Sequence, residues 1–392
     1  MTDQLKKNIH VIVATGVWNL DNLRYRRHRF AEYLSKLDNT EEVIWVCPST
    51  EMPNESFVIL ENGIKEFHVP DLHKNRVFRF ARYFDIFNQK HLNKLVRYLE
   101  SKSEYTHYLW YTFPGFPYLG DAHNWTKVTY DCSDLWATSM TGSKNLILKL
   151  REESILSAEK RIIIRADTVF CTSDFLHENV LKITGVNKNK VNTLENGVEF
   201  ALFTKDDSSK VDYDLEINNG PILGFIGGIK PKLDFALLSS VMEARPDWDL
   251  LLVGPDGTNG DEDFVALKNL KNVKWIDKVP PTEVPAYMKK IDIGILPYKQ
   301  SIYNQAVFPL KLFEFLAVGK PVVGMNLPST KKYAEDNVFE YIEDVTATAF
   351  ISKCERLYEE KEEKIKRRIK IAKQKDWNII FSKMVDGVIG KN

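Results

Sequence analysis

Short runs of apolar and β-branched residues alternate with longer amphipathic stretches along the whole chain. This alternation is typical of parallel sheets whose strands are joined by crossover helices. In the first half we expect helices over Leu23–Leu37, Phe87–Glu100 and Leu146–Arg165. The strands expected there are His10–Ala14, Val43–Cys47, Tyr108–Tyr111, Val128–Tyr130 and Thr168–Cys171. The pattern therefore predicts an α/β fold.

A polar stretch at Lys205–Gly220, the best linker candidate, precedes a second run of the same pattern. The strands expected in this half are Ile222–Ile226, Leu250–Val253, Val273–Ile276, Ile291–Leu296 and Val322–Val323. Because one architecture occurs twice, we expect two Rossmann-like domains, residues 1–200 and 201–375, with parallel sheets that face a central cleft. Such sheets bind ligands beyond the carboxyl ends of their strands.

The composition supports two folded domains and argues against one class of binding partner. The 392 residues are 44% apolar and 12% aromatic, and the net charge of zero argues against a general nucleic-acid binder. The first apolar run is too short for a signal peptide, and no run approaches the ~18 apolar residues of a membrane span. The scattered cysteines favour buried thiols in a reducing compartment: Cys47, Cys132, Cys171 and Cys354. We therefore expect a cytoplasmic protein.

The segment Phe308–Gly324, FPLKLFEFLAVGKPVVG, predicts a short helix with both ends marked. Pro309 suits the first helical position, and Gly319 suits the position just past the end. Lys311 and Glu314 are three residues apart and share a face. The simplest interpretation is a surface ion pair worth a few tenths of a kcal/mol. The alternative is a ligand site, because a helix N-terminus suits a phosphate and a carboxylate one turn later suits ribose hydroxyls.

A pair of glycines follows the first strand of the second half, in Gly227-Gly228-Ile229-Lys230-Pro231-Lys232. Paired glycines let the backbone approach a diphosphate closely, and Lys230 and Lys232 are able to neutralise it. Glycines after strands are also common without a ligand, and solvated lysines are the simpler interpretation. The stretch lacks the GxGxxG pattern, which argues against an NAD-linked oxidoreductase.

Six segments in order resemble one enzyme family: VIVATGVWNLDNLRYRRHRFAEYL, YDCSDLW, RIIIRADTVFCTSDFLHENV, LENGVE, FIGGIKPKLDF and YNQAVFPLKLFEFLAVGKPVVGMNLPST. They are similar to GT-B glycosyltransferases of bacterial cell-surface polysaccharide assembly. The resemblance implies that Glu314 binds ribose and that Lys311 and the glycine amides face the diphosphate. The donor-binding residues it implies are Gly227, Gly228, Lys230, Lys232, Pro309, Leu310, Lys311 and Glu314.

The resemblance also implies the reaction: transfer of a sugar from a nucleoside-diphosphate donor, with UDP expected, to a cell-surface glycan or a lipid-linked acceptor. It implies that the last segment, 376–392, is a helix that crosses back to the first domain. Many retaining members carry a second Glu where this chain has Ala306, and the adjacent Asn304 and Gln305 are able to supply hydrogen bonds instead. Asp277 replaces a usual Gly. These departures leave the donor sugar and the stereochemistry open.

No cofactor or metal is expected. The sequences Asp212-Tyr213-Asp214 and Asp247-Trp248-Asp249 resemble the metal-binding DxD motif of another glycosyltransferase fold. One lies in the linker and the other at the amino end of a strand, so we interpret both as solvated acids. Positive groups and helix amides would then stabilise the leaving diphosphate.

Two aspartates are candidates for catalysis in the first domain. Asp131 and Asp134 lie in YDCSD, just after an expected strand. An inverting transferase needs a base for the acceptor hydroxyl, and a carboxylate at a strand end is suited to that role. A retaining enzyme would use these groups to orient the acceptor. Asp134 is also a possible helix cap.

The acceptor candidates lie near the first strand. Gly16 ends that strand, and Arg24, Arg27 and His28 are expected to share one helix face toward an anionic acceptor. We interpret the neighbouring Arg26 and Arg29 as solvated.

A basic and aromatic stretch follows later in the domain: Lys74, Arg76, Phe78, Arg79, Phe80, Arg82, Tyr83 and Phe84. This mixture suits peripheral contact with an anionic membrane, and equally a helix buried on its aromatic side. Two rivals to the transferase remain open: a nucleotide-sugar epimerase, which needs no acceptor, and an inactive scaffold subunit of a polysaccharide-synthesis complex.

Overall fold

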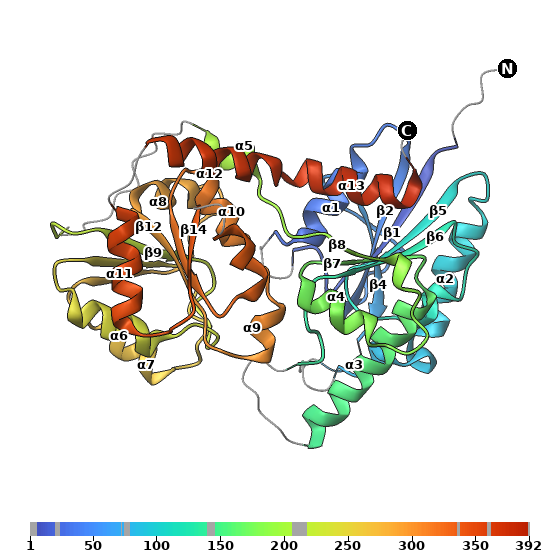
Figure 1. Ribbon diagram of the computed structural model, residues 1–392. Coiled ribbons are helices and arrows are strands. Elements are labelled where there is room, and N and C mark those ends of the chain that lie inside the picture. Colours follow the sequence, from blue (N-terminus) through green and yellow to red (C-terminus); the bar gives the residue numbers. More distant parts are fainter. Residues whose placement is uncertain are drawn as a thin grey trace. The chain divides into compact units, whose positions relative to one another are not determined.

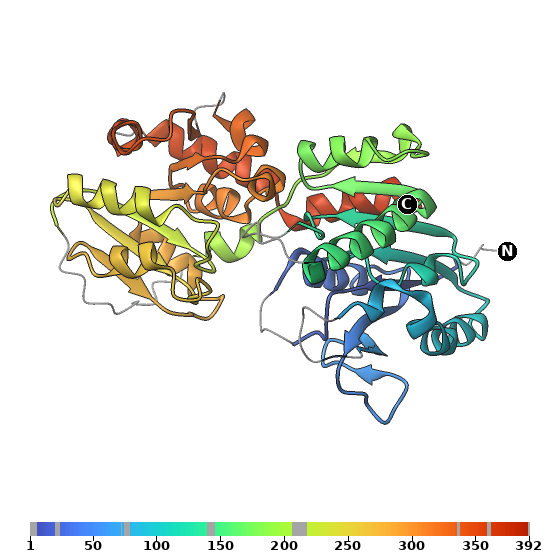
Figure 2. The same cartoon turned by 90° about the horizontal axis from the view of Figure 1, so that it is seen from below.

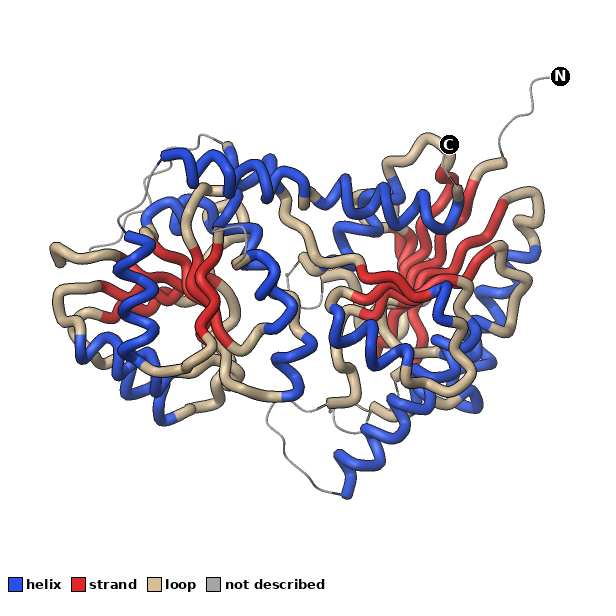
Figure 3. Tube along the Cα trace, viewed as in Figure 1, coloured by secondary structure: helices blue, strands red, loops and turns tan. Residues whose placement is uncertain are grey.

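A computed structural model describes residues 6–19, 24–71, 73, 79–138, 146–205, 218–334, 338–358 and 362–390. The chain divides into two compact units, Met1–Glu195 with Phe381–Asn392 (unit 1) and Asn196–Ile380 (unit 2). Each unit is a sheet with helices on both faces (Figures 1 and 2). The strands form the centre of each unit in the trace of Figure 3. The α/β prediction of two Rossmann-like domains is thus confirmed.

Unit 1 contains a sheet in the order β3-β4-β2-β1-β5-β6-β7-β8. Its strands are β1 (Asn8–Val13), β2 (Thr40–Ser49), β3 (Val58–Ile59), β4 (Lys65–Pro70), β5 (Thr106–Tyr111), β6 (Lys127–Cys132), β7 (Thr168–Cys171) and β8 (Val191–Thr193). All neighbours pair in parallel except β3, which is antiparallel to β4. The helices of this unit are α1 (Arg26–Ser35), α2 (Asp85–Glu100), α3 (Leu146–Arg165) and α4 (Asp174–Leu181).

Unit 2 repeats the arrangement with the order β11-β10-β9-β12-β13-β14, all parallel. Its strands are β9 (Ile222–Ile226), β10 (Asp249–Val253), β11 (Val273–Ile276), β12 (Ile293–Pro297), β13 (Val322–Met325) and β14 (Phe339–Ile342). Its helices are α5 (Phe200–Thr204), α6 (Phe235–Ala244), α7 (Glu262–Lys268), α8 (Val284–Lys290), α9 (Ile302–Ala306), α10 (Leu310–Ala317), α11 (Ala347–Tyr358) and α12 (Glu362–Gln374). The strand order reverses between β9 and β12, which is where such sheets bind ligands.

The last helix, α13 (Trp377–Ile389), begins in unit 2 and ends in unit 1. At its start, the Trp377 amide donates to the Val198 carbonyl within unit 2 (3.0 Å). Further along, the Phe381 ring lies 5.2 Å from the Phe30 ring of α1 within unit 1. The helix expected in the final segment is present, and each of its ends packs on a different unit.

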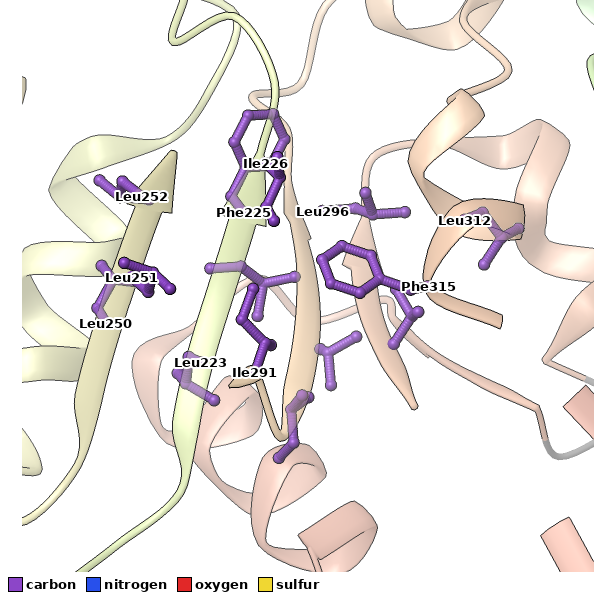
Figure 4. Packing of buried hydrophobic residues seen from close by; sticks show 14 of the residues in the cluster. Leu223, Phe225, Ile226, Leu250, Leu251, Leu252, Ile291, Leu296, Leu312 and Phe315 are labelled. Carbon is purple, nitrogen blue, oxygen red and sulfur yellow. The ribbon is translucent and has the colours of Figure 1, made fainter. Parts of the chain in front are cut away.

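The core of unit 2 fixes the position of α10. Leu312, Phe313, Phe315 and Leu316 of this helix are fully buried. Figure 4 shows Phe315 pointing from α10 toward Leu296 and the strands. A Cβ on Gly294 of β12 would lie only 2.6 Å from the Phe315 ring, so the helix packs directly on backbone. The face of α10 opposite this core is left for polar groups.

The expected elements were found with small shifts in their ends. β7, β9 and β11 have the predicted bounds, and α1 begins at Arg26 rather than Leu23, which lies outside the described residues. β3, β4, β8 and β14 were missed because they are short and lack a clear alternation of apolar and polar residues. Most of the proposed linker, 206–217, lies outside the described residues. The helices of the described part include none long and apolar enough to cross a bilayer.

Candidate active site

The helix α10 begins and ends close to where the sequence marks it. Pro309 is the N-cap, with φ −75° and ψ 127°, and Leu310 is the first helical residue, so Pro309 stands one position earlier than expected. Gly319 follows the end with φ +77°, as a glycine after a helix should. The N-terminal amides and their partial positive charge therefore lie at Leu310 and Lys311.

Lys311 and Glu314 form an ion pair on the polar face of α10. The Lys311 ammonium lies 2.6 Å from the Glu314 carboxylate, whose side chain is 11% exposed. This burial distinguishes the pair from the surface pair considered above, because a solvated pair would be largely exposed. A carboxylate held there, beside the start of a helix and an ammonium group, is positioned to accept hydrogen bonds from hydroxyls of a ligand.

Two glycine loops meet beside this pair. Gly227 has φ +150° and Gly254 has φ +139°, values that L-residues with a side chain rarely adopt. A Cβ on Gly254 would lie 2.1 Å from the Gly227 carbonyl oxygen, so the loops after β9 and β10 touch through backbone. A Cβ on Gly227 would lie 3.1 Å from Cε of Lys311. The glycine loops and the α10 pair thus meet at the carboxyl end of β9, beside the point where the strand order reverses.

The other candidate groups of unit 2 differ in their positions. Lys230 is exposed, and its Cε would lie 3.2 Å from a Cβ on Gly228. The Lys232 ammonium lies over the Tyr298 ring, 5.2 Å from its centroid. Burial raises the pKa of the Tyr298 phenol to about 12, and the nearby Lys311 ammonium opposes that shift. Lys230 is therefore near the glycine loop, whereas Lys232 is stacked on aromatic rings.

One expectation for unit 2 needs correction. Asp249 is 2% exposed rather than solvated, and its carboxylate accepts hydrogen bonds from the Asn218 amide (2.8 Å) and side chain (2.9 Å). It is a structural acid within β10. Asp247 is exposed and paired with Arg245, as a solvated acid would be. The other DxD sequence, residues 212–214, lies outside the described residues.

Asn304 also has a structural position. Its side chain is completely buried, and its amide donates to the carbonyls of Lys299 (2.7 Å) and Lys232 (3.2 Å). These bonds use the Nδ2 group to fix the loop after β12, whereas Oδ1 is buried without a hydrogen-bond partner among the described residues. Ala306, two residues later, is buried.

The candidate base of unit 1, Asp131, lies inside β6 rather than after it, and it is 3% exposed. Arg26, which we expected to be solvated, is 6% exposed, and its Nε donates to Asp131 Oδ2 at 2.8 Å. Arg26 also donates through Nη1 to the Glu195 carbonyl (3.0 Å). Asp131 Oδ1 is buried without a hydrogen-bond partner among the described residues. One carboxylate oxygen is thus held by Arg26, and the other is unpaired.

A signal for Arg26 was present in the sequence. Arg26, Phe30 and Leu34 are spaced four residues apart, which places the arginine on the apolar face of α1. Phe30 and Leu34 are fully buried. A buried carboxylate such as Asp131 needs a cationic partner, and an arginine on an apolar face is the natural one.

The three expected acceptor cations do not form one patch. Arg24 precedes α1 and pairs with Glu32, and the Arg27 guanidinium lies 4.3 Å from the Tyr25 ring centroid. His28 is buried, and its Nδ1 accepts from the Tyr25 amide (3.2 Å) while its Nε2 lies 3.2 Å from the Trp18 carbonyl. A neutral ring with the proton on Nε2 satisfies both contacts. His28, in α1, therefore holds the loop that contains Trp18.

Gly16 also belongs to this loop, and its carbonyl accepts from the Trp45 indole at 2.9 Å. Arg29, expected to be solvated, is half-buried and donates to the Arg24 carbonyl. Asp134 is half-buried, and its carboxylate accepts from the next amide, that of Leu135, at 2.9 Å.

Sequence reasoning did not identify Glu159 of α3. Tyr130 donates to the Glu159 carboxylate at 2.5 Å, and Cys132 lies on the same β6 strand. Burial raises the pKa of Glu159 to about 7. Successive residues of a strand face opposite sides of the sheet, so Glu159, which is bonded to Tyr130, lies on the other face from Asp131. The Asp134 carboxylate adds to the upward shift of the Glu159 pKa. The signal was weak, because Glu159 is one of several acids along α3.

In the described part of the basic and aromatic stretch, the arginines are paired rather than arranged as an open cationic face. Lys74, Arg76 and Phe78 lie outside the described residues. Arg79 and Arg82 both pair with Asp71, and Arg82 and Tyr83 are buried. All four cysteines are free and buried, as predicted.

Comparison with known proteins agrees with the geometry. Residues 210–375 match the family described as Glycosyl transferases group 1. The chain is 49% identical over 381 residues to a Bacillus subtilis (strain 168) protein provisionally named as the teichuronic acid biosynthesis glycosyltransferase TuaH, and the match covers 96% of each. The chain belongs to the group 1 glycosyltransferases, and it is an enzyme of glycosyl transfer.

Solved structures show the same fold at low identity. Sucrose-phosphate synthase from Thermosynechococcus elongatus matches with a TM-score of 0.69, 16% identity and 97% of both chains covered. Anabaena Alr3699/HepE in complex with UDP and glucose matches with a TM-score of 0.67, 13% identity, and 98% and 100% of the chains covered. The fold of this chain is therefore GT-B.

Proposed function

We propose that this chain transfers a sugar from a UDP-sugar to a cell-surface polysaccharide or its lipid-linked precursor. The observation that carries the proposal is the group formed by Gly227, Lys311 and Glu314 at the carboxyl end of β9. The amides of Gly227 and Gly228, with the start of α10, would hold the diphosphate. UDP as the nucleotide is supported by the HepE complexes, which contain UDP and UDP-glucose.

The donor half of the reaction divides among three groups. Lys311 would leave its pairing with Glu314 for the diphosphate, and Glu314 would then accept both ribose hydroxyls. Lys230, beside Gly228, would add a second positive charge. Cationic groups and helix amides of this kind stabilise a leaving diphosphate, so we propose that the donor site needs no divalent cation.

The acceptor half would lie in unit 1. Asp131, held by Arg26 and carrying an unpaired Oδ1, would take the acceptor hydroxyl proton or orient that hydroxyl. Asp134 would assist from the following turn. Arg24 and Arg27 would contact an anionic acceptor, and the loop that contains Gly16, held by His28 of α1, would form the wall beside them.

The acceptor class is supported by the relative named for teichuronic acid biosynthesis, since the two chains match along nearly their whole length. A cytoplasmic location is supported by the free, buried state of all four cysteines.

The proposal is tested by measuring UDP release from a panel of UDP-sugars with and without a membrane glycan fraction. Release that requires the acceptor, with labelled sugar incorporated into glycan, supports the transferase. Turnover without acceptor would favour a nucleotide-sugar epimerase. Neither turnover nor nucleotide binding by folded protein would favour an inactive scaffold subunit.

We further propose peripheral contact with an anionic membrane, through Phe84 of the stretch considered above and two apolar residues that follow it. Phe84, Ile86 and Phe87 at the start of α2 are 44%, 82% and 48% exposed. In a flotation assay, the parent chain should float with anionic vesicles, and an Ile86→Glu, Phe87→Glu variant should not. The control Val265→Glu, at an exposed apolar position of unit 2, should float like the parent. Absence of binding to anionic vesicles would end this proposal.

A further inference from the structure

A thiol, a carboxylate and an imidazole converge on one face of the unit 1 sheet. Cys47 lies on β2, and Glu66 and His68 lie on the adjacent strand β4. Cys47 pairs in register with His68, and Glu66 is two residues before His68, so all three side chains share one face. One donor atom from each lies within 4.8 Å of the others.

The contacts of His68 orient the ring toward this centre. Its Nδ1 lies 3.4 Å from the Glu51 carbonyl, which suits an N–H donor at that nitrogen. Its Nε2 lies 3.1 Å from Glu66 Oε2. A carbonyl that holds the far nitrogen of a histidine is the usual support of a metal-binding imidazole. Two electron-rich atoms that face each other, as Nε2 and Oε2 would, need a positive charge between them.

The surroundings hold the other two groups. The Trp18 amide donates to the second oxygen of Glu66, and Trp45 precedes Cys47 by two positions on the same face of β2. Cys47 is completely buried, and Glu66 is 5% exposed. The His68 side chain is 12% exposed and is the most open member of the group. The three donors are thus held by the pairing of β2 with β4 and by the Trp18 amide.

We propose that Cys47, Glu66 and His68 bind one zinc ion. Thiolate, imidazole and carboxylate together suit Zn²⁺, whereas Mg²⁺ and Ca²⁺ take oxygen ligands. In a tetrahedral zinc site, neighbouring ligand atoms lie about 3.5 Å apart. Side-chain rotations that move the donor atoms by about an ångström would bring the three atoms to this separation. The two anionic ligands balance the charge of the ion. Three protein ligands leave the fourth position for water or a substrate oxygen.

This site is separate from the donor site of unit 2, and the proposal does not depend on the proposed function. The competing account is an ion pair of Glu66 with a protonated His68, with Cys47 as a buried thiol. The two accounts differ in what the chain does when a metal is offered.

The test is a titration of the full chain with Co²⁺ after dialysis against a chelator, followed by displacement with Zn²⁺. Bound Co²⁺ should give a thiolate-to-metal charge-transfer band that saturates near one equivalent and disappears when Zn²⁺ is added. Cys47→Ser should abolish the band, and His68→Gln should weaken binding by at least about tenfold. Cys354→Ser, at a buried thiol of unit 2, should bind like the parent.

Circular dichroism and the melting temperature without metal establish that each variant is folded. If Cys47→Ser does not fold, the half-buried His68→Gln variant decides the question. The proposal is wrong if the parent gives no charge-transfer band, if Cys47→Ser retains it, or if folded His68→Gln binds Co²⁺ as tightly as the parent.

Discussion

Replacing Arg26 with methionine should destabilise unit 1 far more than its position in a run of basic residues suggests. The methionine keeps much of the apolar stem but leaves the Asp131 carboxylate, 3% exposed, without its partner. Breaking a buried ion pair by removing one member costs about 3–5 kcal/mol, because the remaining charge is uncompensated. We therefore expect the free energy of unfolding to fall by about 3–5 kcal/mol.

A neighbouring pair supplies the matched control. Arg24 and Glu32 form an ion pair in the same segment, with side chains 45% and 23% exposed. Arg24→Met should cost at most about 1 kcal/mol, as exposed pairs do. The double variant Arg26→Met, Asp131→Asn should recover part of the loss, because it removes the lone buried charge.

Urea denaturation, with the midpoint and the slope both recorded, measures these differences. The reasoning fails if Arg26→Met costs no more than Arg24→Met. It also fails if the double variant is no more stable than Arg26→Met alone, since the cost would then not come from the unpaired Asp131 carboxylate.

Three further predictions follow from burial and contact. Gly254→Ala should abolish nucleotide binding in a thermal-shift assay, because its Cβ would lie 2.1 Å from the Gly227 carbonyl oxygen; unchanged binding would contradict the packing of the two loops. Burial raises the Glu159 pKa from 4.5 to about 7, so the folded chain holds a proton that the unfolded chain loses between these values. As the pH rises from about 4 to about 8, the free energy of unfolding of Glu159→Gln should therefore increase relative to that of the parent, by up to about 3 kcal/mol. Urea titrations measure this difference, and a difference that does not change with pH would refute the raised pKa. Asp249→Ala should cost about 1–3 kcal/mol and Asp247→Ala less than about 1 kcal/mol, with equal losses contradicting the buried role of Asp249.

The elements around the donor site could be predicted from the sequence because their signals are local. The α10 helix is marked by Pro309 and Gly319 at its two ends, and the strand β9 is a short, mainly apolar run. The Lys311–Glu314 pair follows from helical spacing alone. Its burial does not, because it depends on how the glycine loop at Gly227 packs against α10.

The groups of unit 1 were harder to predict because their partners are distant in the chain. Arg26 and Asp131 are separated by 105 residues, and the expected helix face of Arg24, Arg27 and His28 left Arg26 as a solvated arginine. The group of Cys47, Glu66 and His68 depends on the pairing of β2 with β4. The strand β4 was not predicted, because the alternation of charged and apolar residues over its six positions is weak.

The donor site is tested most directly by thermal stabilisation with UDP, GDP, ADP and CMP and their sugars. A ligand at about 100 times its Kd stabilises the native state by about 2.7 kcal/mol, which shifts the melting temperature by several degrees. The matched control for Glu314→Gln is Glu340→Gln, because Glu340 is also largely buried and ion-paired, to Lys353 and Arg356.

We predict that UDP and a UDP-sugar stabilise the parent and Glu340→Gln, and that Glu314→Gln loses the shift. No stabilisation of the folded parent by any nucleotide, or an equal shift in Glu314→Gln, would contradict the assignment of Gly227, Lys311 and Glu314 as the donor site.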